Sequence, residues 1–179
     1  MKIGKRSAIF LDRDGVLNQV VLKNGKPYPP PSAEEVFMLP GVKAALTDLK
    51  RQRFILVVVT NQPDVARGTQ QRAVVEKIHA MLKTQLPLDD ILVCYHAEND
   101  GCNCHKPRPG MLLQAADQYD LDLANSFMIG DRWRDIDAGA AVGCRTILID
   151  YHYRDRQPTN TPGLRVSSLR VAADWILSQ

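Results

Sequence analysis

The chain alternates short apolar segments with segments whose apolar residues recur at helical spacing. The longest apolar segment, Phe54 to Val59, is apolar at every position, is rich in β-branched residues and ends at Thr60 and Asn61. An uninterrupted run of this kind is typical of a strand that is buried on both faces of a parallel sheet. This feature favours an α/β fold over all-helical or antiparallel folds.

Four further apolar segments repeat the pattern, so the predicted strands are Ala8 to Leu11, Phe54 to Val59, Ile91 to Tyr95, Phe127 to Ile129 and Thr146 to Ile149. Helical spacing predicts helices around residues 42–49, 74–82, 111–116 and 169–177. Because strand and helix alternate and crossovers are right-handed, we expect a doubly wound, mainly parallel sheet with helices on both faces. The Pro- and Gly-containing stretch from Val16 to Pro40 is expected to be an irregular loop.

Size and charge limit the classes of function. A chain of 179 residues with 45% hydrophobic residues suits a single domain spanning residues 1–179. A net charge of +3 is too small and too scattered for a nucleic-acid footprint, and no segment approaches the ~20 apolar residues that span a bilayer. Since Asp12 precedes any possible signal-peptide core, we expect a cytoplasmic protein with no nucleic-acid or membrane partner, and a monomer.

Polar residues follow several predicted strands directly. Asp12 and Asp14 lie beside Gly15 after the first strand, Thr60 and Asn61 follow the second, and Asp131 follows the fourth. The carboxyl ends of parallel strands form the ligand crevice of open α/β sheets, so these groups are expected to converge there. Taken alone, the Asp12-Arg13-Asp14 sequence also fits an ordinary solvated turn.

The expected crevice would hold Asp12, Asp14 and Asp131 together, with Lys106 on its approach. Three carboxylates in one cleft repel one another unless a divalent cation lies among them. A site with oxygen ligands only suits Mg²⁺, which keeps several waters and shares a phosphate.

A second cluster contains Cys94, His96, Cys102 and Cys104 within eleven residues. Three sulfurs and one imidazole complete a tetrahedral shell, which is typical of a structural zinc site rather than a catalytic one. We therefore expect Zn²⁺ to order a loop at about residues 94–105; free thiols are the alternative. Cys144 stands apart and is expected to be a buried apolar residue.

Four sequence segments together resemble the haloacid dehalogenase superfamily of phosphohydrolases: LDRDGV, VVVTN, the lysine of HKPRPG, and GDRWRD. They occur in the order of that family and extend over almost the whole chain. The resemblance implies that Asp12 is the nucleophile and forms an aspartyl-phosphate, while Asp14 is the general acid and then the general base. It implies Mg²⁺ ligation by the Asp12 carboxylate, the Asp14 backbone carbonyl and Asp131, with Asp135 orienting metal-bound water.

The resemblance also implies a set of phosphate-binding and substrate-binding residues, which comprises Arg13, Thr60, Asn61, Gln62, His105 and Lys106. The sequence TNQ followed by ARG, the Cys/His pairs and KPRPGM are most similar to the D-glycero-D-manno-heptose 1,7-bisphosphate phosphatases. Those proteins commonly have arginine where this chain has His105, which puts affinity for a second phosphate in question.

The expected activity is thus Mg²⁺-dependent removal of the C7 phosphate from a heptose 1,7-bisphosphate, a small phosphosugar, in the synthesis of lipopolysaccharide precursors. A histidinol-phosphate phosphatase is the alternative substrate assignment, and a non-catalytic, zinc-stabilised binding module is the alternative from another class. The segments after Asp14 and Thr60 leave no room for an inserted cap domain, so we expect an open, capless cleft.

Overall fold

The computed structural model describes residues 5–179, and its central feature is a six-stranded sheet in the order β5-β4-β1-β6-β7-β8. All neighbouring strands are parallel. The strands are β1 (Ala8–Leu11), β4 (Ile55–Asn61), β5 (Asp90–Cys94), β6 (Phe127–Gly130), β7 (Arg145–Ile149) and β8 (Leu164–Val166). The prediction of a doubly wound, parallel α/β sheet is confirmed.

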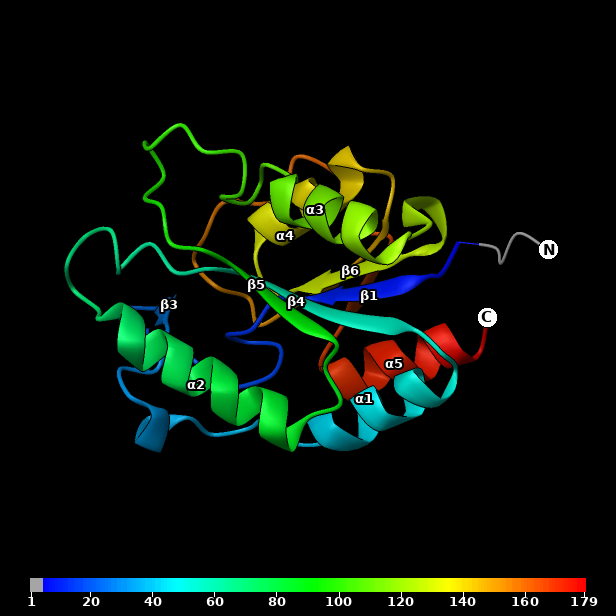
Figure 1. Cartoon of the computed structure of the whole chain (residues 1–179), viewed down its shortest axis with the longest axis horizontal. Coiled ribbons are helices and arrows are strands. Elements are labelled where there is room, and N and C mark those ends of the chain that lie inside the picture. The colour runs from blue at the N-terminus through cyan, green and yellow to red at the C-terminus, as the bar shows by residue number, and fades with distance from the viewer. Residues whose placement is uncertain (1–4) are drawn as a thin grey trace.

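Helices cover both faces of this sheet (Figure 1). One face carries α1 (Val42–Arg51), α2 (Arg72–Gln85) and α5 (Leu169–Leu177), and the other carries α3 (Gly110–Tyr119) and α4 (Trp133–Ala141). Strand β1 shows why two layers are needed. Ile9 and Leu11 are buried in the core of the first face, whereas Ala8 and Phe10 are buried in the core of the second. Successive side chains of a strand point to opposite faces, so a fully apolar strand requires cover on both.

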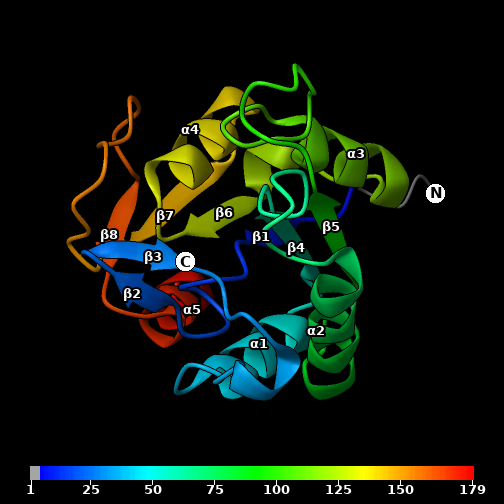
Figure 2. The same ribbon diagram turned by 90° about the vertical axis from the view of Figure 1, so that its left-hand side faces the viewer.

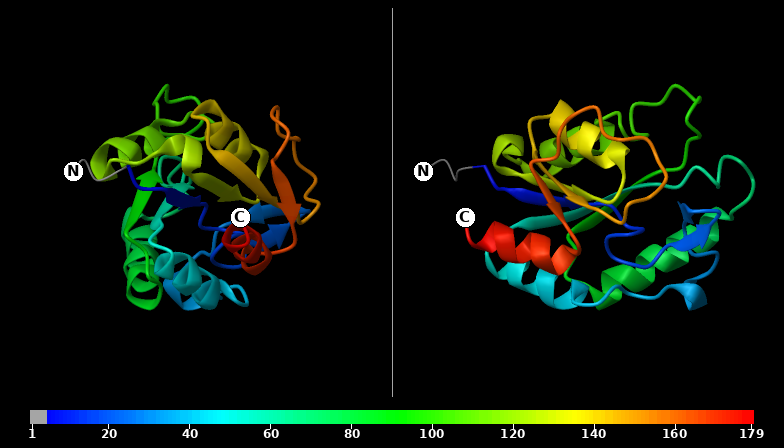
Figure 3. Two further views of the ribbon diagram at one scale, coloured as in Figure 1. Left: turned by 90° about the vertical axis from the view of Figure 1, so that its right-hand side faces the viewer. Right: turned by 180° about the vertical axis from the view of Figure 1, so that it is seen from behind.

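The chain changes its winding direction at β1. It continues from β1 to β4 and β5 on one side, then returns to β6 on the other side of β1. Figure 2 shows the β2–β3 hairpin (Val21–Lys23 and Lys26–Tyr28), the loop after β4 and the loop after β5 on the same side of the molecule. The C-terminal end of α5 lies at the opposite end (Figure 3). The reversal at β1 therefore places the crevice at the ends of β1, β4 and β6.

Two parts of the sequence prediction were wrong. The stretch from Val16 to Pro40 is not wholly irregular, because it contains the β2–β3 hairpin and a short 3₁₀ helix, Ala33–Glu35. The hairpin turns at Asn24 and Gly25, both with positive φ, as a two-residue hairpin loop requires. The sheet also has a sixth strand, β8, which follows another 3₁₀ helix, Leu123–Asn125, and α4 in the chain.

The two segments at which an inserted cap domain would lie, after Asp14 and after Thr60, form only local structure. After Asp14 the chain forms the β2–β3 hairpin, and after Thr60 it reaches α2 through a run of turns. Neither segment holds a further domain in the part of the chain that the structure describes. Among residues 5–179, no helix has the length and apolar character that crossing a bilayer requires.

Candidate active site

A cleft of about 330 Å³ opens at the carboxyl ends of β1, β4 and β6. Asp12 follows β1 directly, and its backbone N–H donates to Ile129 O in β6 at 3.0 Å. The cleft is lined by Asp12, Asp14, Asn61, Lys106 and Asp131 together with the rim residues Val20, Lys26, Pro27, Tyr28, Pro29, Pro63, Asp64, Arg67, Glu98, Arg132 and Arg134. The structure thus brings together five of the predicted site residues, which come from four separate segments of the sequence.

Three carboxylates converge in this cleft. One oxygen each from Asp12, Asp131 and Asp135 lies within 4.8 Å of the others. Burial and neighbouring negative charge raise the pKa of Asp12 to about 6, and burial, Asp12 and Asp135 raise the pKa of Asp131 as well. Within residues 5–179, the buried Oδ1 of Asp131 has no hydrogen-bond donor. Crowded carboxylates with an unsatisfied oxygen fit a hard divalent cation such as Mg²⁺.

Lys106 supplies positive charge beside these carboxylates. Its side chain is 1% exposed, and Nζ lies 3.1 Å from Asp12 Oδ1 and 2.6 Å from Asp135 Oδ1. Burial opposes the charge of Lys106, yet the two carboxylates raise the pKa of its amino group above the ordinary value. The backbone of Lys106 is held by Asn61, whose amide accepts from its N–H at 3.0 Å and donates to its carbonyl at 3.1 Å. The ammonium group is therefore fixed as well as charged.

Gly15 allows the loop that follows β1 to lie close to Asp131 in the loop that follows β6. Its φ is +80°, and a Cβ at this position would lie 2.0 Å from Asp131 Oδ2. Both its backbone conformation and its missing side chain are required, since an L-residue would be strained and would displace Asp131. Its N–H donates to Asn18 O at 2.8 Å, and its carbonyl accepts from the Tyr151 hydroxyl at 3.0 Å.

Asp14 is surrounded by hydrogen-bond donors. Arg13 donates through Nε and Nη2, with Nη2 2.8 Å from Asp14 Oδ2. Gln62 Nε2 donates to Oδ2 at 3.0 Å, and Asn18 Nδ2 donates to Oδ1 at 2.9 Å. The orientation of the Asp14 carboxylate is thus set by two side chains of the loop after β1, Arg13 and Asn18, and by Gln62, which follows β4.

Four predicted phosphate-binding or substrate-binding residues lie behind the cleft. The side chains of Arg13, Thr60, Gln62 and His105 are buried and are not among the described residues that line it. Thr60 Oγ1 accepts from Gln62 Nε2 at 3.0 Å, and the His105 ring donates through Nδ1 to His96 O at 3.0 Å. In this structure Gln62 and Arg13 contact Asp14 instead of the open cleft, and His105 is directed toward the cysteine-containing loop.

Sequence reasoning missed His79, which is buried on α2 with Nε2 3.0 Å from Arg13 Nη1. A signal for it was present, because His79 occupies the same helix face as the buried residues Val75, Ile78 and Leu82. A polar residue at a buried helical position needs a partner, but only the fold identifies that partner as Arg13.

The predicted zinc ligands do come together. One donor atom each from Cys94, His96, Cys102 and Cys104 lies within 4.8 Å of the others. Sγ of Cys94 is 3.6 Å from His96 Nδ1 and 3.7 Å from Cys102 Sγ, whereas Cys104 Sγ approaches Cys94 Sγ to 2.9 Å. Ligands at Zn–S distances of about 2.3 Å in a tetrahedron are separated by about 3.7 Å, so most of the cluster already has suitable spacing.

Burial and the neighbouring thiols raise the pKa of Cys94, so that a thiolate there requires a nearby cation. Lys106 follows this loop directly in the sequence. The residues on either side of it, His105 and Arg108, form hydrogen bonds to backbone carbonyls of the loop. Arg108 donates to Cys102 O and to Glu98 O, and His105 donates to His96 O. Order in the cysteine-containing loop is therefore transmitted to the lysine in the cleft.

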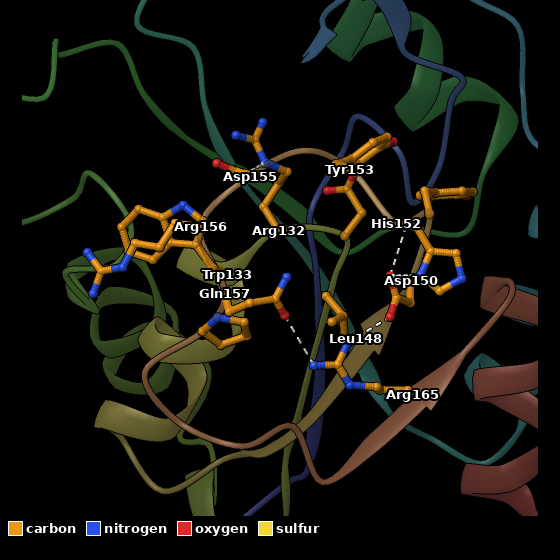
Figure 4. A pocket seen from close by; sticks show the side chains of 13 residues that line it. Arg132, Trp133, Leu148, Asp150, His152, Tyr153, Asp155, Arg156, Gln157 and Arg165 are labelled. Atoms are coloured by element: carbon orange, nitrogen blue, oxygen red, sulfur yellow. Dashed lines mark hydrogen bonds and ion pairs between the residues drawn. The ribbon is translucent and has the colours of Figure 1, made fainter. Parts of the chain in front are cut away.

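A second cavity of about 350 Å³ adjoins the cleft and shares Asp131 and Arg132 with it (Figure 4). Its charged groups are paired internally: Arg132 Nε lies 2.5 Å from Asp155 Oδ2, and Arg165 Nη1 lies 2.7 Å from Asp150 Oδ2. Arg156 lines the same cavity and lies over the Trp133 ring, 4.3 Å from its centroid.

Comparison with protein families gives a match to the model described as HAD-hydrolase-like over residues 103–170. The D-glycero-beta-D-manno-heptose-1,7-bisphosphate 7-phosphatase of Pseudomonas aeruginosa is 35% identical over 149 residues, covering 80% of this chain and 81% of that protein. The protein of the same name from Bordetella bronchiseptica is 38% identical over 146 residues, covering 79% of each.

Solved structures show the same similarity. The crystal structure of D,D-heptose 1,7-bisphosphate phosphatase from B. bronchiseptica, complexed with magnesium and phosphate, matches with a TM-score of 0.79 and 32% identity. That match covers 96% of this chain and 98% of the other. A putative HAD-like phosphatase from Mesorhizobium loti matches with a TM-score of 0.75 and 26% identity over 97% of this chain and 88% of the other.

Proposed function

Because this chain belongs to the HAD-like hydrolase family and is a phosphoric monoester hydrolase, we propose that it removes the C7 phosphate of D-glycero-D-manno-heptose 1,7-bisphosphate. The similarity to heptose bisphosphate phosphatases over most of both chains supports this substrate. The observation that carries the chemistry is the convergence of Asp12, Lys106 and Asp131 in one cleft. The expected cytoplasmic location, monomeric state and single domain of residues 1–179 remain predictions.

In the first step, a carboxylate oxygen of Asp12 attacks the phosphorus atom of the substrate, and the bond from phosphorus to the sugar oxygen breaks. Asp14 donates its proton to that leaving oxygen, and the phosphoryl group remains on Asp12 as an aspartyl-phosphate. In the second step, Asp14 removes a proton from water as the water oxygen attacks phosphorus, and the bond from phosphorus to the Asp12 oxygen breaks. Phosphate then leaves, and both aspartates return to their starting states.

The cation would be held by the carboxylates of Asp12 and Asp131 and by the backbone carbonyl of Asp14, and it would neutralise charge on the phosphoryl oxygens. Asp135 orients Lys106 through the 2.6 Å contact, so that the ammonium group faces Asp12 and the transferring phosphoryl group. Asn61 lines the phosphate-binding end of the cleft and acts there through the backbone of Lys106, whereas Thr60 lies behind the cleft, where its hydroxyl oxygen accepts from Gln62. We propose Zn²⁺ for Cys94, His96, Cys102 and Cys104.

The rim of the cleft suits a substrate with a second anionic group. Arg134 lines it, and within the described residues its buried Nε has no acceptor. Its Nη2 lies 3.4 Å from Glu98, a side chain that is 55% exposed and is easily displaced. Lys26 and Arg67 line the same rim, where Arg67 Nη1 lies 3.2 Å from Asp64 Oδ1. These cations favour a bisphosphate over a monophosphate substrate.

A screen of phosphorylated metabolites with and without Mg²⁺ tests the proposal. We expect phosphate release from the heptose 1,7-bisphosphate, dependent on Mg²⁺ and faster than from any other compound in the screen. A preference for histidinol phosphate would reassign the substrate but keep the chemistry. Failure to hydrolyse any phosphomonoester would contradict the proposed function and favour a zinc-stabilised binding module.

A further inference from the structure

His79 is a buried histidine, 7% exposed, that the proposed reaction steps do not use. Its Nε2 lies 3.0 Å from Nη1 of Arg13, which is itself 0% exposed. An arginine guanidinium carries donors only, so Arg13 donates and His79 Nε2 accepts. The proton of the neutral His79 ring therefore resides on Nδ1.

The other edge of the same guanidinium faces Asp14. Nε donates to Oδ1 at 3.1 Å and Nη2 donates to Oδ2 at 2.8 Å, which is a bidentate contact. Because the guanidinium is planar and rigid, an acceptor at Nη1 fixes the direction in which Nε and Nη2 point. His79 thus determines where Arg13 holds the carboxylate of Asp14.

Burial and the charge of Arg13 lower the pKa of His79 to about 3. The ring is therefore neutral and available as an acceptor throughout the physiological pH range. An apolar side chain in its place would leave the Nη1–H group of Arg13 buried without an acceptor, which favours rotation of the guanidinium away from its present position.

We propose that His79 is a positioning residue that, through Arg13, holds Asp14 in the orientation required for proton transfer to the leaving group. The inference rests on the proposed function, in which Asp14 is the general acid. A side chain of α2, a helix outside the cleft, would then set the orientation of the Asp14 carboxylate.

Substrates with different leaving groups distinguish a positioning role of His79 from a merely structural one. An alkyl phosphate releases a poor leaving group that needs a proton, whereas p-nitrophenyl phosphate releases a stabilised anion that does not. A loss of general-acid catalysis, worth about 10²–10⁴-fold, therefore falls on the alkyl substrate. A loss of folded protein lowers both activities equally.

The experiment compares kcat/KM for heptose 1,7-bisphosphate with kcat/KM for p-nitrophenyl phosphate. In His79→Leu we expect the ratio of the two to fall about 10-fold or more, with kcat affected more than KM. His79→Gln, which keeps an acceptor near Nε2, restores the ratio to within about 3-fold of wild type. Ile78→Val, the adjacent buried position on α2, lowers stability without changing the ratio.

An equal loss on both substrates in His79→Leu, or a failure of His79→Gln to restore the ratio, overturns the inference. Asp14→Asn identifies which proposal fails. If Asp14→Asn lowers the ratio of the two kcat/KM values while His79→Leu does not, only the role of His79 is wrong. If Asp14→Asn leaves that ratio unchanged, Asp14 is not the general acid, and the role of His79 fails as well. Wild-type protein that hydrolyses neither compound overturns the proposed function itself.

A measurement on wild-type protein covers the case in which His79→Leu does not fold. The ¹⁵N spectrum of the imidazole rings between about pH 6 and 8 reports the tautomer of His79. We expect a protonated Nδ1 and an unprotonated, hydrogen-bonded Nε2. A proton on Nε2 is incompatible with donation from Arg13 and overturns the inference.

Discussion

Charge balance around Lys106 is the central property of the site at the scale of single residues. One buried ammonium group contacts Asp12 and Asp135, and Asp131 lies within the same cluster. A buried charge is tolerated only when it is paired, so removal of any member alters the protonation of the rest. Lys106 keeps a partner when either Asp12 or Asp135 is replaced, so loss of one carboxylate is expected to act on chemistry more than on folding.

Asp12→Asn is expected to abolish turnover, by about 10⁴-fold or more, because an amide oxygen does not form the covalent intermediate. Stability should be kept or slightly raised, since the substitution removes one buried like charge from the cluster. Steady-state assays and thermal unfolding measure the two effects. Asp117→Asn on the exposed side of α3 is the control, and near wild-type turnover of Asp12→Asn would rule out its role as nucleophile.

Gly15→Ala is expected to reduce Mg²⁺ affinity or kcat by about 10–100-fold, because the new Cβ displaces Asp131 Oδ2. Gly143→Ala is a matched control: its φ is +79°, but nothing lies within 4 Å of the added Cβ. Both variants should lose about 1–2 kcal/mol of stability from backbone strain. Only Gly15→Ala should lose activity, as measured by Mg²⁺ titration of turnover; equal activities would contradict the packing argument.

Arg134→Gln is expected to raise KM for the heptose bisphosphate about 10-fold, because one charge-assisted hydrogen bond to the second phosphate is lost. Turnover of p-nitrophenyl phosphate, which has no second phosphate, should be unchanged. Arg165→Gln, in the adjoining cavity of Figure 4, is the control. An equal rise in KM for both substrates would show that Arg134 does not recognise the distal group.

At the scale of elements, strands were predicted well where apolar runs were long and poorly where they were short. Phe54 to Val59 identified β4 because six consecutive apolar residues fit only a doubly covered strand. Leu164–Val166 was missed, because a three-residue edge strand has no recognisable period. The β2–β3 hairpin was missed although Asn24-Gly25 is a standard hairpin signal; its strands are exposed and lack the usual alternation.

The cysteine-containing loop is an element whose order is expected to depend on a metal. Cys104→Ser should lose the bound zinc, about one per chain, lower the thermal midpoint and reduce turnover through Lys106. Cys144→Ser is the control, since Cys144 is another free cysteine that is buried but lies outside the cluster. Elemental analysis and thermal unfolding of protein purified without chelators check this. Wild-type protein without zinc would contradict the assignment.

At the scale of the whole molecule, the crowded carboxylates of the cleft oppose folding when they are ionised. The raised pKa values of Asp12 and Asp131 mean that the folded state binds more protons than the unfolded chain does, in the case of Asp12 between about pH 4 and 6. The contribution of these two groups to stability therefore falls as pH rises through that window. We expect binding of Mg²⁺ to the ionised carboxylates to reverse the loss.

Mg²⁺ at about 100 times its Kd should raise the thermal midpoint by about 5–10 °C at about pH 7.5, and by much less at about pH 5. Asp131→Asn, which removes one charge from the cluster, should show little of this increase at either pH and should be no less stable than wild type without Mg²⁺. Thermal unfolding with Mg²⁺ or with chelator measures both. An increase that is independent of pH would place the cation elsewhere.

The location of the site was predictable from the whole chain, whereas its inner contacts were not. Strand ends with polar residues identified Asp12, Asn61 and Asp131 as neighbours, because parallel strands end at one edge. The positions of Arg13 and His105 were not predictable, since the direction of a side chain beside a turn depends on packing with distant elements. His79 is the clearest example: its partner lies on β1's loop, and no local pattern connects the two.

The position of β1 in the middle of the sheet has a consequence for synthesis on the ribosome. Its neighbours on the two sides are β4 and β6, and β6 belongs to the last third of the chain. During translation, β1 therefore leaves the ribosome long before β6, and the edge of β1 that pairs with β6 stays unpaired until β6 has been synthesised. Chemistry begins only after β6 has closed the sheet, so a partly translated chain is inert toward the metabolites around it.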